Sequence, residues 1–302
     1  MNYNSFVNSN ILIGYISAIV AAILFGSVST IGKPILSTVD PLLLSSIIYL
    51  TAGLFFTPSA IRVPSKITKK YFFLIIISAI SGAAIAPIVF FQGLKMSTAA
   101  DTALLANGET VFSILFALFI FRERLRPSGY IAVTLILIGV FLVTTNLDFQ
   151  SSVFSLNIGN VLVISSTIIW GFDNNICKII ARQIHISRLI QLKALIGGSI
   201  LIGTVVLSGI PFNIQSEQLI PIFLLGVFGF AISLFLYLHS IKRIGVIKAS
   251  SLLSLSAVFG LIFAIIFLHE SIDINQVIAI FVMIFGIHLM YMYEKKNEII
   301  LK

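Results

Sequence analysis

Ten long apolar segments with few charged residues are the feature that most restricts what this chain can fold into. They span residues 11–31, 41–60, 72–95, 99–121, 128–146, 158–180, 186–207, 219–241, 249–268 and 275–293. A helix needs roughly 20 such residues to cross about 30 Å of hydrocarbon. The strands of a membrane barrel would alternate apolar and polar residues, and these segments do not. The sequence therefore predicts an all-α membrane protein with ten transmembrane helices.

The composition leaves no room for a sizeable soluble domain. Of 302 residues, 58% are hydrophobic and 10% are charged, and the mean hydropathy is +1.11, whereas soluble chains carry about 25% charged residues. The net charge of +8 could indicate a nucleic-acid partner. However, Lys and Arg form short clusters between the apolar segments, as loops that face anionic lipid do. We therefore expect a multi-pass protein of the cell membrane with no nucleic-acid partner.

The distribution of Lys and Arg among the loops predicts the orientation of the chain. When alternate loops are counted as one side, that side holds nearly all loop Lys and Arg, and the other side holds little beyond Lys95. The rich side contains Arg62, Lys66, Lys69, Lys70, Arg122, Arg124, Arg126, Arg182, Arg188, Lys242, Arg243, Lys248, Lys295, Lys296 and Lys302. Because positively charged loops stay inside, both termini are predicted to be cytoplasmic, which agrees with an even number of crossings.

An internal repeat divides the chain into two similar halves. Residues 93–123 align with residues 240–270 at a constant offset of 270 − 123 = 147. Identical pairs are Lys95/Lys242, Leu105/Leu252, Val111/Val258, Phe112/Phe259, Phe116/Phe263, Ala117/Ala264 and Glu123/Glu270, and Gly82/Gly229 and Gly139/Gly286 continue the offset. Shared hydrophobicity would match some Phe and Val, but it would not align Lys, Gly and Glu. We therefore predict two repeats, residues 1–147 and residues 148–302.

Each repeat would hold five helices, and an odd number inverts the second copy in the membrane relative to the first. Inverted repeats are a transporter architecture, with the substrate site near the middle of the bilayer where the halves meet. A channel or an enzyme could be duplicated in the same way. The repeat therefore favours transport but leaves those alternatives open.

Further residues repeat at nearly the same spacing and carry a family resemblance. The matching residues are Phe25-Gly26 with Trp170-Gly171, Lys33 with Lys178, and Glu123 with Glu270. Over essentially the whole chain, this pattern resembles the EamA family of ten-helix carriers within the drug/metabolite transporter superfamily. The resemblance implies a secondary active carrier that works by alternating access, with export or exchange as its direction.

Two places depart from the usual pattern of that family. Family members often carry an Arg in the middle of the second helix, where Ile48 stands in the first half and Lys193 stands near the equivalent place in the second. The fourth helix often reads Asn-Leu-Glu-Pro, and here it reads Asn107-Gly108-Glu109-Thr110. These changes concern the chemistry of the substrate site more than the fold.

Glu109 and its neighbour Asn107 lie near the middle of the predicted fourth helix. An ionisable group in hydrocarbon costs at least about 2.5–3.5 kcal/mol, so it usually faces a cavity or a partner. Glu109 is therefore the foremost candidate for binding a substrate or a coupled proton, with Asn107 beside it. The alternative is a neutral Glu109 that is hydrogen-bonded to a neighbouring helix.

A dense polar cluster lies on the predicted sixth helix. Spacings of three and four place Trp170, Asp173 and Asn174 on one helix face, as in the wall of a cavity. The alternative is that these side chains hold helices together by hydrogen bonds. Lys193, on the seventh helix, could pair with Asp173 or Glu109, or it could extend to the lipid headgroups.

Gln92 and His239 occupy equivalent positions at the offset of 147, and Tyr237 lies on the same helix as His239. A His in a membrane helix can carry protons, and a Tyr can hydrogen-bond or stack on a solute. Structural hydrogen bonds and anchoring at the lipid interface are the alternatives. We include all three residues among the candidates for substrate binding.

Three acids near helix ends are expected to lie outside the transport site. Asp101 is near the outer end of the fourth helix and is expected to be solvated. The repetition of Glu123 and Glu270 indicates a structural role, such as pairing with Arg or capping the N-terminus of a neighbouring helix.

Signatures of enzymes are missing from the sequence. There is no Walker loop for ATP, no Asp-rich magnesium motif, no His pair with metal-ligand spacing on one helix and no Gly-x-Ser-x-Gly elbow. Cys177 is the one cysteine, so a disulfide framework is excluded. We expect no enzyme, metal or cofactor, and a substrate such as an amino acid, nucleoside, sugar or drug-like compound. The alternatives are a translocator of lipid-linked or lipid-headgroup substrates, and a membrane scaffold or membrane enzyme.

Overall fold

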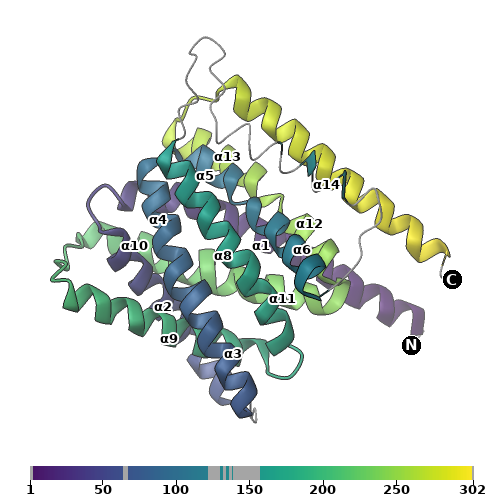
Figure 1. The fold of residues 1–302 in the computed structure, drawn as a ribbon, viewed down its shortest axis with the longest axis horizontal. Helices are drawn as coiled ribbons and strands as arrows, with labels where there is room; N and C mark the ends of the chain where they lie inside the picture. The colour runs from purple at the N-terminus through teal and green to yellow at the C-terminus, as the bar shows by residue number, and fades with distance from the viewer. Residues whose placement is uncertain are drawn as a thin grey trace.

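A computed structural model of the chain describes residues 3–63, 67–121, 130, 131, 134, 135, 138 and 157–300, and these residues form helices without any strand. Figure 1 shows the helices packed into one bundle. In chain order the elements are α1 (Tyr3–Ile35), α2 (Pro41–Ile61), α3 (Lys69–Ile80), η1 (Ser81–Ile85), α4 (Ala86–Met96), α5 (Ala99–Leu105), α6 (Gly108–Phe121), α8 (Ile158–Ile180), α9 (Ile186–Leu207), α10 (Ser216–Leu224), η2 (Leu225–Ile232), α11 (Ser233–Ile244), α12 (Val246–Leu253), α13 (Ser256–Leu268) and α14 (Ile274–Ile300).

The predicted all-helical fold is confirmed. Nine of the ten predicted segments are helical where the structure describes them, and most of the segment 128–146 lies outside the described residues. Within the described ranges, six helical stretches are long and apolar enough to cross a membrane: Ile11–Ile35, Pro41–Ile61, Lys69–Met96, Ala99–Ile120, Ile186–Leu207 and Ser216–Ile244. Ser256–Leu268 and Ile274–Gly286 are shorter apolar helices. The count of ten crossings stays a prediction.

Local sequence signals fix where several helices begin. The side chain of Asp40 accepts a hydrogen bond of 2.8 Å from the N–H of Leu42, and Pro41 occupies the first helical position. Asn157 caps α8 in the same way, accepting from Gly159 at 2.9 Å. Such caps satisfy N–H groups that the first turn of a helix leaves without partners. Each cap therefore sets the register of the helix that follows it.

Four of the predicted helices are not continuous α-helices. The third and eighth contain π-helical turns, η1 and η2, and the fourth and ninth are interrupted between α5 and α6 and between α12 and α13. At the first interruption the N–H of Asn107 bonds the carbonyl of Leu104 at 3.2 Å, three residues back, so the α-helical ladder stops. At the second, Leu255 bonds Leu252 in the same way at 3.1 Å.

The two halves of the chain pack into each other. α2 lies along α9, α1 packs against α11 and α13, and α8 packs against α4 and α6. Each of these contacts joins a helix before residue 147 to one after it. The interior between them is therefore lined by both halves.

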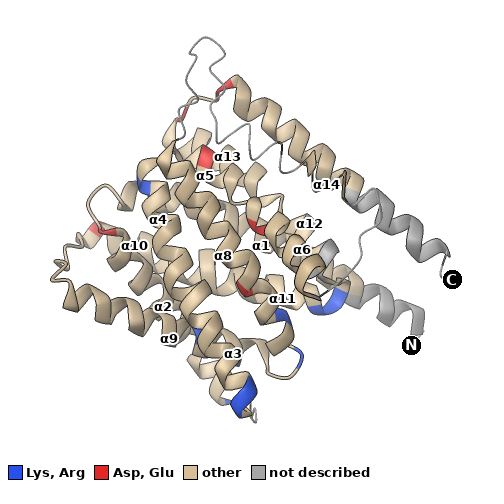
Figure 2. Ribbon diagram, viewed as in Figure 1, with Lys and Arg blue, Asp and Glu red and all other residues tan. Residues whose placement is uncertain are grey.

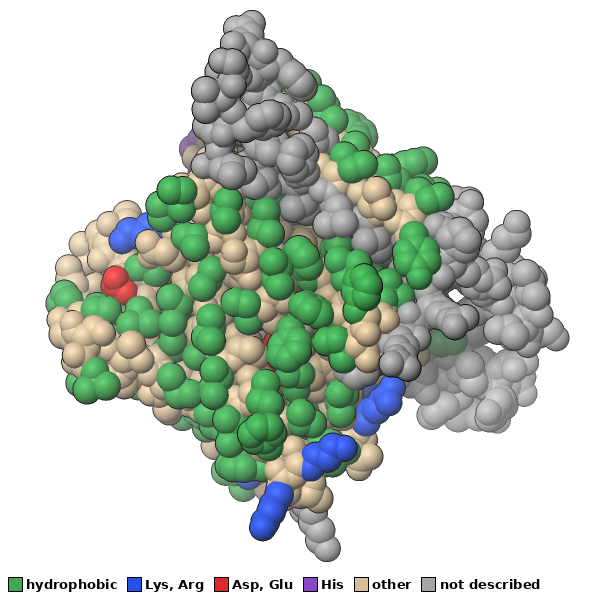
Figure 3. Space-filling view, in the orientation of Figure 1, with side chains coloured by type: hydrophobic (Ala, Val, Ile, Leu, Met, Phe, Trp, Pro, Cys, Tyr) green, Lys and Arg blue, Asp and Glu red, His purple; other side chains and the backbone are tan. Residues whose placement is uncertain are grey.

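The outer surface is that of a protein embedded in lipid. Figure 3 shows hydrophobic side chains covering the face formed by α3, α4, α6 and α8, and large apolar side chains such as Phe119 and Leu207 are 79% and 90% exposed. A soluble monomer rarely exposes so extensive an apolar surface. In Figure 2, Lys and Arg gather where α3 begins and α11 ends, while acidic residues gather near the junction of α13 and α14.

Candidate functional site

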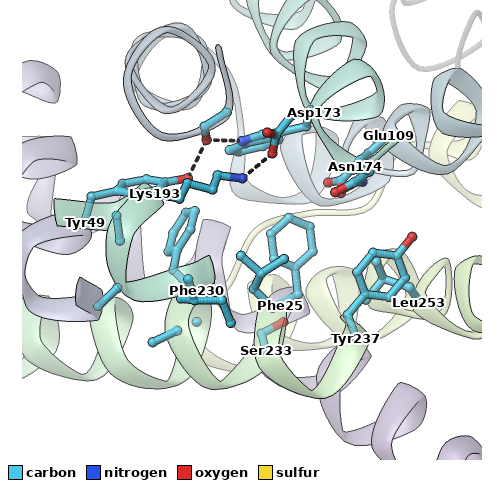
Figure 4. Close-up of a pocket in the computed structure, with 18 residues that line it drawn as sticks. Phe25, Tyr49, Glu109, Asp173, Asn174, Lys193, Phe230, Ser233, Tyr237 and Leu253 are labelled. Carbon is cyan, nitrogen blue, oxygen red and sulfur yellow. Dashed lines mark hydrogen bonds and ion pairs between the residues drawn. The ribbon is translucent and has the colours of Figure 1, made fainter. Parts of the chain in front are cut away.

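A cavity of about 60 Å³ lies inside the bundle, among α1, α2, α6, α8, α9, η2 and α11. Figure 4 shows the rings of Phe25, Phe230 and Tyr237 on one side of it, and the charged and amide side chains, with the ring of Tyr49, on the other. The polar and aromatic lining consists of Phe25, Tyr49, Glu109, Trp170, Asp173, Asn174, Lys193, Phe230, Ser233 and Tyr237. Because Glu109 comes from one half and Asp173 from the other, both halves supply charged groups to the same space.

Asp173 and Lys193 form an ion pair at the wall of the cavity. The Nζ of Lys193 donates to Oδ2 of Asp173, and their side chains are 4% and 1% exposed. The Oγ of Ser78 donates to the other carboxylate oxygen. The sequence left Asp173 and Glu109 open as partners of Lys193, and in the structure Lys193 pairs with Asp173. Breaking a buried pair by removing one partner is strongly destabilising, because an uncompensated charge stays behind.

Glu109 is held by an amide. Its carboxylate accepts a hydrogen bond of 2.6 Å from Nδ2 of Asn174, and that amide also donates to Oγ of Ser113 at 3.2 Å. Glu109 lies in the first turn of α6, immediately after the interruption that follows α5. The interruption therefore places this carboxyl group at the cavity (Figure 4). An acid bound by a neutral donor is free to meet a cationic group of a substrate or to carry a proton.

The π-helical turn η1 presents a backbone carbonyl to two side chains of the lining. The carbonyl of Gly82 accepts hydrogen bonds from the hydroxyl of Tyr49 at 2.9 Å and from Nε1 of Trp170 at 3.0 Å. π-helical turns within α-helices are frequent at functional sites. A side chain at Gly82 would collide with the carboxylate of Asp173, so the close approach of these two helices requires glycine.

Trp170 is the centre of an aromatic group. Its ring lies 6.2 Å from that of Phe25 in an edge-to-face arrangement, 5.0 Å from that of Phe90 and 6.3 Å from that of Phe230. Further along the cavity, the hydroxyl of Tyr237 is hydrogen-bonded to Oγ of Ser250 at 2.8 Å. The cavity thus offers large apolar faces beside its charges.

The structure brings six of the nine candidate residues together and separates the other three. Glu109, Trp170, Asp173, Asn174, Lys193 and Tyr237 line the cavity. Gln92 is exposed on α4 and contacts Met96, and His239 stacks on Phe235 outside the lining. Asn107 is buried in the interruption after α5, where its Oδ1 accepts no hydrogen bond.

Sequence reasoning missed three aromatic lining residues, Phe25, Tyr49 and Phe230, because they look like ordinary residues of apolar helices. One signal was present in the repeat. Gly82 and Gly229 are equivalent at the offset of 147 and both line the cavity. A pair of repeated glycines in the third and eighth helices therefore pointed to the place where the helices approach the site.

The expectation that Asp101 is solvated was wrong. Its side chain is buried, and it accepts hydrogen bonds from Nε2 of Gln276 at 2.6 Å and Nδ2 of Asn160 at 3.5 Å. The expected structural role of Glu270 is confirmed, because its carboxylate caps α5 by accepting from the N–H groups of Ala99 and Ala100. Glu123 lies outside the described residues.

The part of the chain that the structure describes contains no group of three His, Cys, Asp or Glu side chains that could hold a metal ion. The groups available at the cavity are two carboxylates, one ammonium group, hydroxyls, an amide and aromatic faces. Such a set is suited to binding an organic solute through charge, hydrogen bonds and stacking.

Comparison with known proteins shows what this chain is similar to. The model of the EamA-like transporter family matches twice, at residues 12–145 and 157–292. A protein of Methanothermobacter thermautotrophicus described as an uncharacterized transporter is 31% identical over 294 residues, covering 92% of this chain and 86% of its own. One of Clostridium kluyveri with the same description is 24% identical over 300 residues, covering 94% of each chain. A crystal structure of 17% identity has a TM-score of 0.71 and covers 96% of this chain and 99% of its own, which shows a shared fold.

Proposed function

Because this chain belongs to the EamA-like transporter family, and is thus a multi-pass transporter of the cell membrane, we propose that it is a secondary carrier of small organic solutes that works by alternating access. The resemblance seen in the sequence is confirmed by the family match over both halves. The observation that carries the proposal is the interior cavity, where Glu109 of one half faces Asp173 and Lys193 of the other. Buried charges at the interface of two repeats are typical of the binding sites of such carriers.

The architecture we propose consists of ten helices in two inverted repeats, residues 1–147 and 148–302, with both termini in the cytoplasm. The equivalent interruptions support it, because α5 and α12 end 253 − 105 = 148 residues apart, close to the offset of 147 in the sequence. The reciprocal packing of α1 on α11 and of α8 on α4 supports it as well. The cluster of Lys and Arg at one end of the bundle supports the orientation with both termini in the cytoplasm (Figure 2),.

The chemistry of the cavity favours a solute with an amino group and an apolar part. Two carboxylates, Glu109 and Asp173, stand against one ammonium group, that of Lys193, so the ionised site has a net negative charge. The faces of Trp170 and Phe25 add an attraction for cations. An amino acid could also place its carboxylate on Lys193, whereas an amine of drug-like size would use the acids and the rings alone. Glu109 would bind the amino group or a coupled proton.

The size of the cavity supports alternating access. Ligand pockets commonly enclose roughly 300–1,000 Å³, whereas this space is about 60 Å³, enough for a few water molecules. The helices around Glu109 must therefore separate before an organic solute can enter. We propose that the π-helical turns and the interrupted helices are the places where this movement occurs, since they already depart from the α-helical ladder.

A ligand screen tests this function directly. Purified protein is heated with amino acids, amines, nucleosides and sugars, and a ligand at 100 times its Kd should stabilise the protein by about 2.7 kcal/mol. We expect amino compounds to stabilise the native chain and to be transported in proteoliposomes. Glu109→Gln and Asp173→Asn should abolish both effects, while Glu217→Gln, which removes an exposed acid of α10, should not. Full transport by both cavity variants would refute the site.

A second candidate function rests on an apolar groove between α1, α10 and α13, with a volume of about 630 Å³. Thr30, Pro34, Gln218, Phe263 and Phe267 are among its lining residues. A groove of this size could admit the chain of an amphipathic substrate, as a translocator of lipid headgroups requires. A photo-crosslinkable lipid that labels this groove, together with an amino-compound screen without hits, would favour that function. An amino compound that stabilises the native chain but not the Glu109→Gln variant would exclude this second function.

A further inference from the structure

The turn that joins α4 to α5 lies between two charged side chains that come from distant parts of the chain. Lys33 is near the end of α1, in the first half. Glu270 follows α13, in the second half, just after His269 ends that helix with a left-handed backbone at φ 53°. Both side chains form hydrogen bonds with the backbone on either side of the same turn. We name Lys33, Glu270 and the turn between Met96 and Ala99 the α4–α5 clasp.

Lys33 binds the end of α4. Its Nζ donates to the carbonyl oxygens of Leu94 at 3.0 Å and Lys95 at 3.1 Å, and to that of Ser97. The last carbonyls of a helix have no partners within it and carry a partial negative charge. The ammonium group of Lys33 therefore satisfies the C-terminus of α4 by both hydrogen bonds and charge.

Glu270 binds the beginning of α5. Its two carboxylate oxygens accept from the N–H groups of Ala99 and Ala100, each at 2.9 Å. The first N–H groups of a helix are likewise unpaired, and they attract anions. The clasp thus matches a cation to the C-terminus of one helix and an anion to the N-terminus of the next.

A buried polar network continues the clasp toward the interior. Ser97 donates its hydroxyl to Asn160 of α8, and Asp101 of α5 is bound by Asn160 and by Gln276 of α14. Ser97, Asp101 and Asn160 are 5%, 4% and 0% exposed, so these side chains are shielded from water. The helices held in this way continue to the cavity, since Phe25 is on α1 and Glu109 begins α6 directly after α5.

We propose that Lys33 and Glu270 keep this end of the bundle closed over the central cavity. Their hydrogen bonds to the α4–α5 turn must break before that end can open. They act as positioning residues that do not touch the solute. The proposal rests on the proposed function, because alternating access requires that each end of the carrier opens and closes. Both side chains are only partly buried, so water can replace their hydrogen bonds at small net cost,. Such bonds suit a contact that is broken once in every cycle.

The test measures access to Thr102, which is fully buried on α5 one turn beyond the clasp. Thr102→Cys is introduced into the full chain with Cys177→Ser, so that the new thiol is the only one. The rate of labelling by a water-soluble maleimide is measured on purified protein without any solute. We expect Glu270→Gln and Lys33→Gln each to raise this rate at least about tenfold, a change that corresponds to about 1.4 kcal/mol in the opening equilibrium.

Matched controls separate opening from general loosening. Glu217→Gln and Lys70→Gln remove the same charges from exposed side chains and should leave the rate unchanged. Ser240→Cys, buried near the end of α11, reports on the opposite end of the bundle and should not gain reactivity in the clasp variants. Equal gains at both cysteines, or no gain at Thr102→Cys in folded Glu270→Gln and Lys33→Gln proteins, would overturn the proposal.

The outcome is independent of whether the proposed function holds. Labelling needs no solute, so an increase at Thr102→Cys would support the clasp even if no compound were transported. If Glu270→Gln does not fold, Lys33→Arg keeps the charge and should retain slow labelling, whereas Lys33→Gln should not. In proteoliposomes, the clasp variants should change the maximal rate of transport while the affinity for the solute changes little. A loss of affinity alone would place Lys33 and Glu270 in the binding site and contradict the proposal.

Discussion

At the scale of single residues, the site depends on a few positions where two helices come very close. Gly82 is the clearest, because a methyl group there would meet the carboxylate of Asp173. That carboxylate also binds Lys193 and Ser78, so it cannot move without breaking a buried ion pair. The absence of a side chain at Gly82 is therefore a condition for the charged wall of the cavity.

Gly82→Ala should lower the free energy of unfolding by about 1–3 kcal/mol, the usual cost of overpacking, and should abolish solute binding. The matched control is Gly203→Ala in α9, where an added methyl group meets nothing within 4 Å. Because alanine favours helix more than glycine does, the control should be neutral or stabilising by up to about 1 kcal/mol. Thermal unfolding in detergent measures both. Equal stability of the two variants would contradict the close contact.

The pair of Asp173 and Lys193 makes a second prediction at this scale. Lys193→Met leaves a buried carboxylate without a partner and should cost about 3–5 kcal/mol of stability. The double variant Asp173→Asn with Lys193→Met removes both charges, so it should be more stable than Lys193→Met alone. Unfolding of both single variants and the double variant gives the coupling energy between the two residues. Additive effects would mean that the ion pair does not exist in the folded protein.

At the scale of elements, irregular and continuous helices line the cavity together. η1 supplies the carbonyl of Gly82, and the interruption after α5 sets Glu109 at the start of α6. α2 and α9, by contrast, are continuous helices that pack along each other. The irregular elements therefore position Glu109 and the carbonyl of Gly82, while the continuous helices α8 and α9 supply the ion pair of Asp173 and Lys193.

The hydroxyl of Tyr49 holds η1 in this arrangement, which Tyr49→Phe would test. Loss of its 2.9 Å hydrogen bond to the carbonyl of Gly82 should cost about 0.5–1.5 kcal/mol,. Trp170 would remain as the second donor to that carbonyl, so the fold should survive. Tyr71→Phe is the matched control, because its hydroxyl makes no hydrogen bond in the described part of the chain. Chemical denaturation should show a loss for Tyr49→Phe and none for Tyr71→Phe.

At the scale of the whole molecule, charge separates along the bundle. Lys and Arg gather at the end where α3 begins and α11 ends (Figure 2), and the apolar belt between the ends is nearly free of charge (Figure 3). Since positively charged loops stay in the cytoplasm, that end should face inward. The α4–α5 clasp, at the other end of these helices, would then face outward.

Topology mapping in intact cells checks this orientation. With Cys177→Ser as background, Ser208→Cys after α9 should react with an impermeant maleimide added outside. Arg182→Cys, between α8 and α9, should react only after the cells are permeabilised. Both positions are exposed, so their difference reports the side of the membrane. The reverse labelling pattern would contradict the proposed orientation in the membrane and place the α4–α5 clasp on the cytoplasmic side.

The sequence by itself determined the helical segments, the duplication and the acids of the site. Runs of apolar residues are local features, and hydrocarbon allows them little besides helix. Glu109 and Asp173 stood out because charge within such runs is costly. The resemblance of Phe25-Gly26 to Trp170-Gly171 and of Lys33 to Lys178 pointed to the EamA-like family, and the family match confirmed it.

Only the tertiary structure decided which of these residues meet. Asp173 rather than Glu109 pairs with Lys193 because α8 and α9 bring them together, and a sequence offers no measure of that crossing. Gln92 was expected at the site but is exposed on α4, where it contacts Met96. Glu270 meets Ala99, 171 residues away, through the packing of α13 on α5. Hydropathy is a property of each residue in the sequence, whereas the partner of a charge depends on how helices cross.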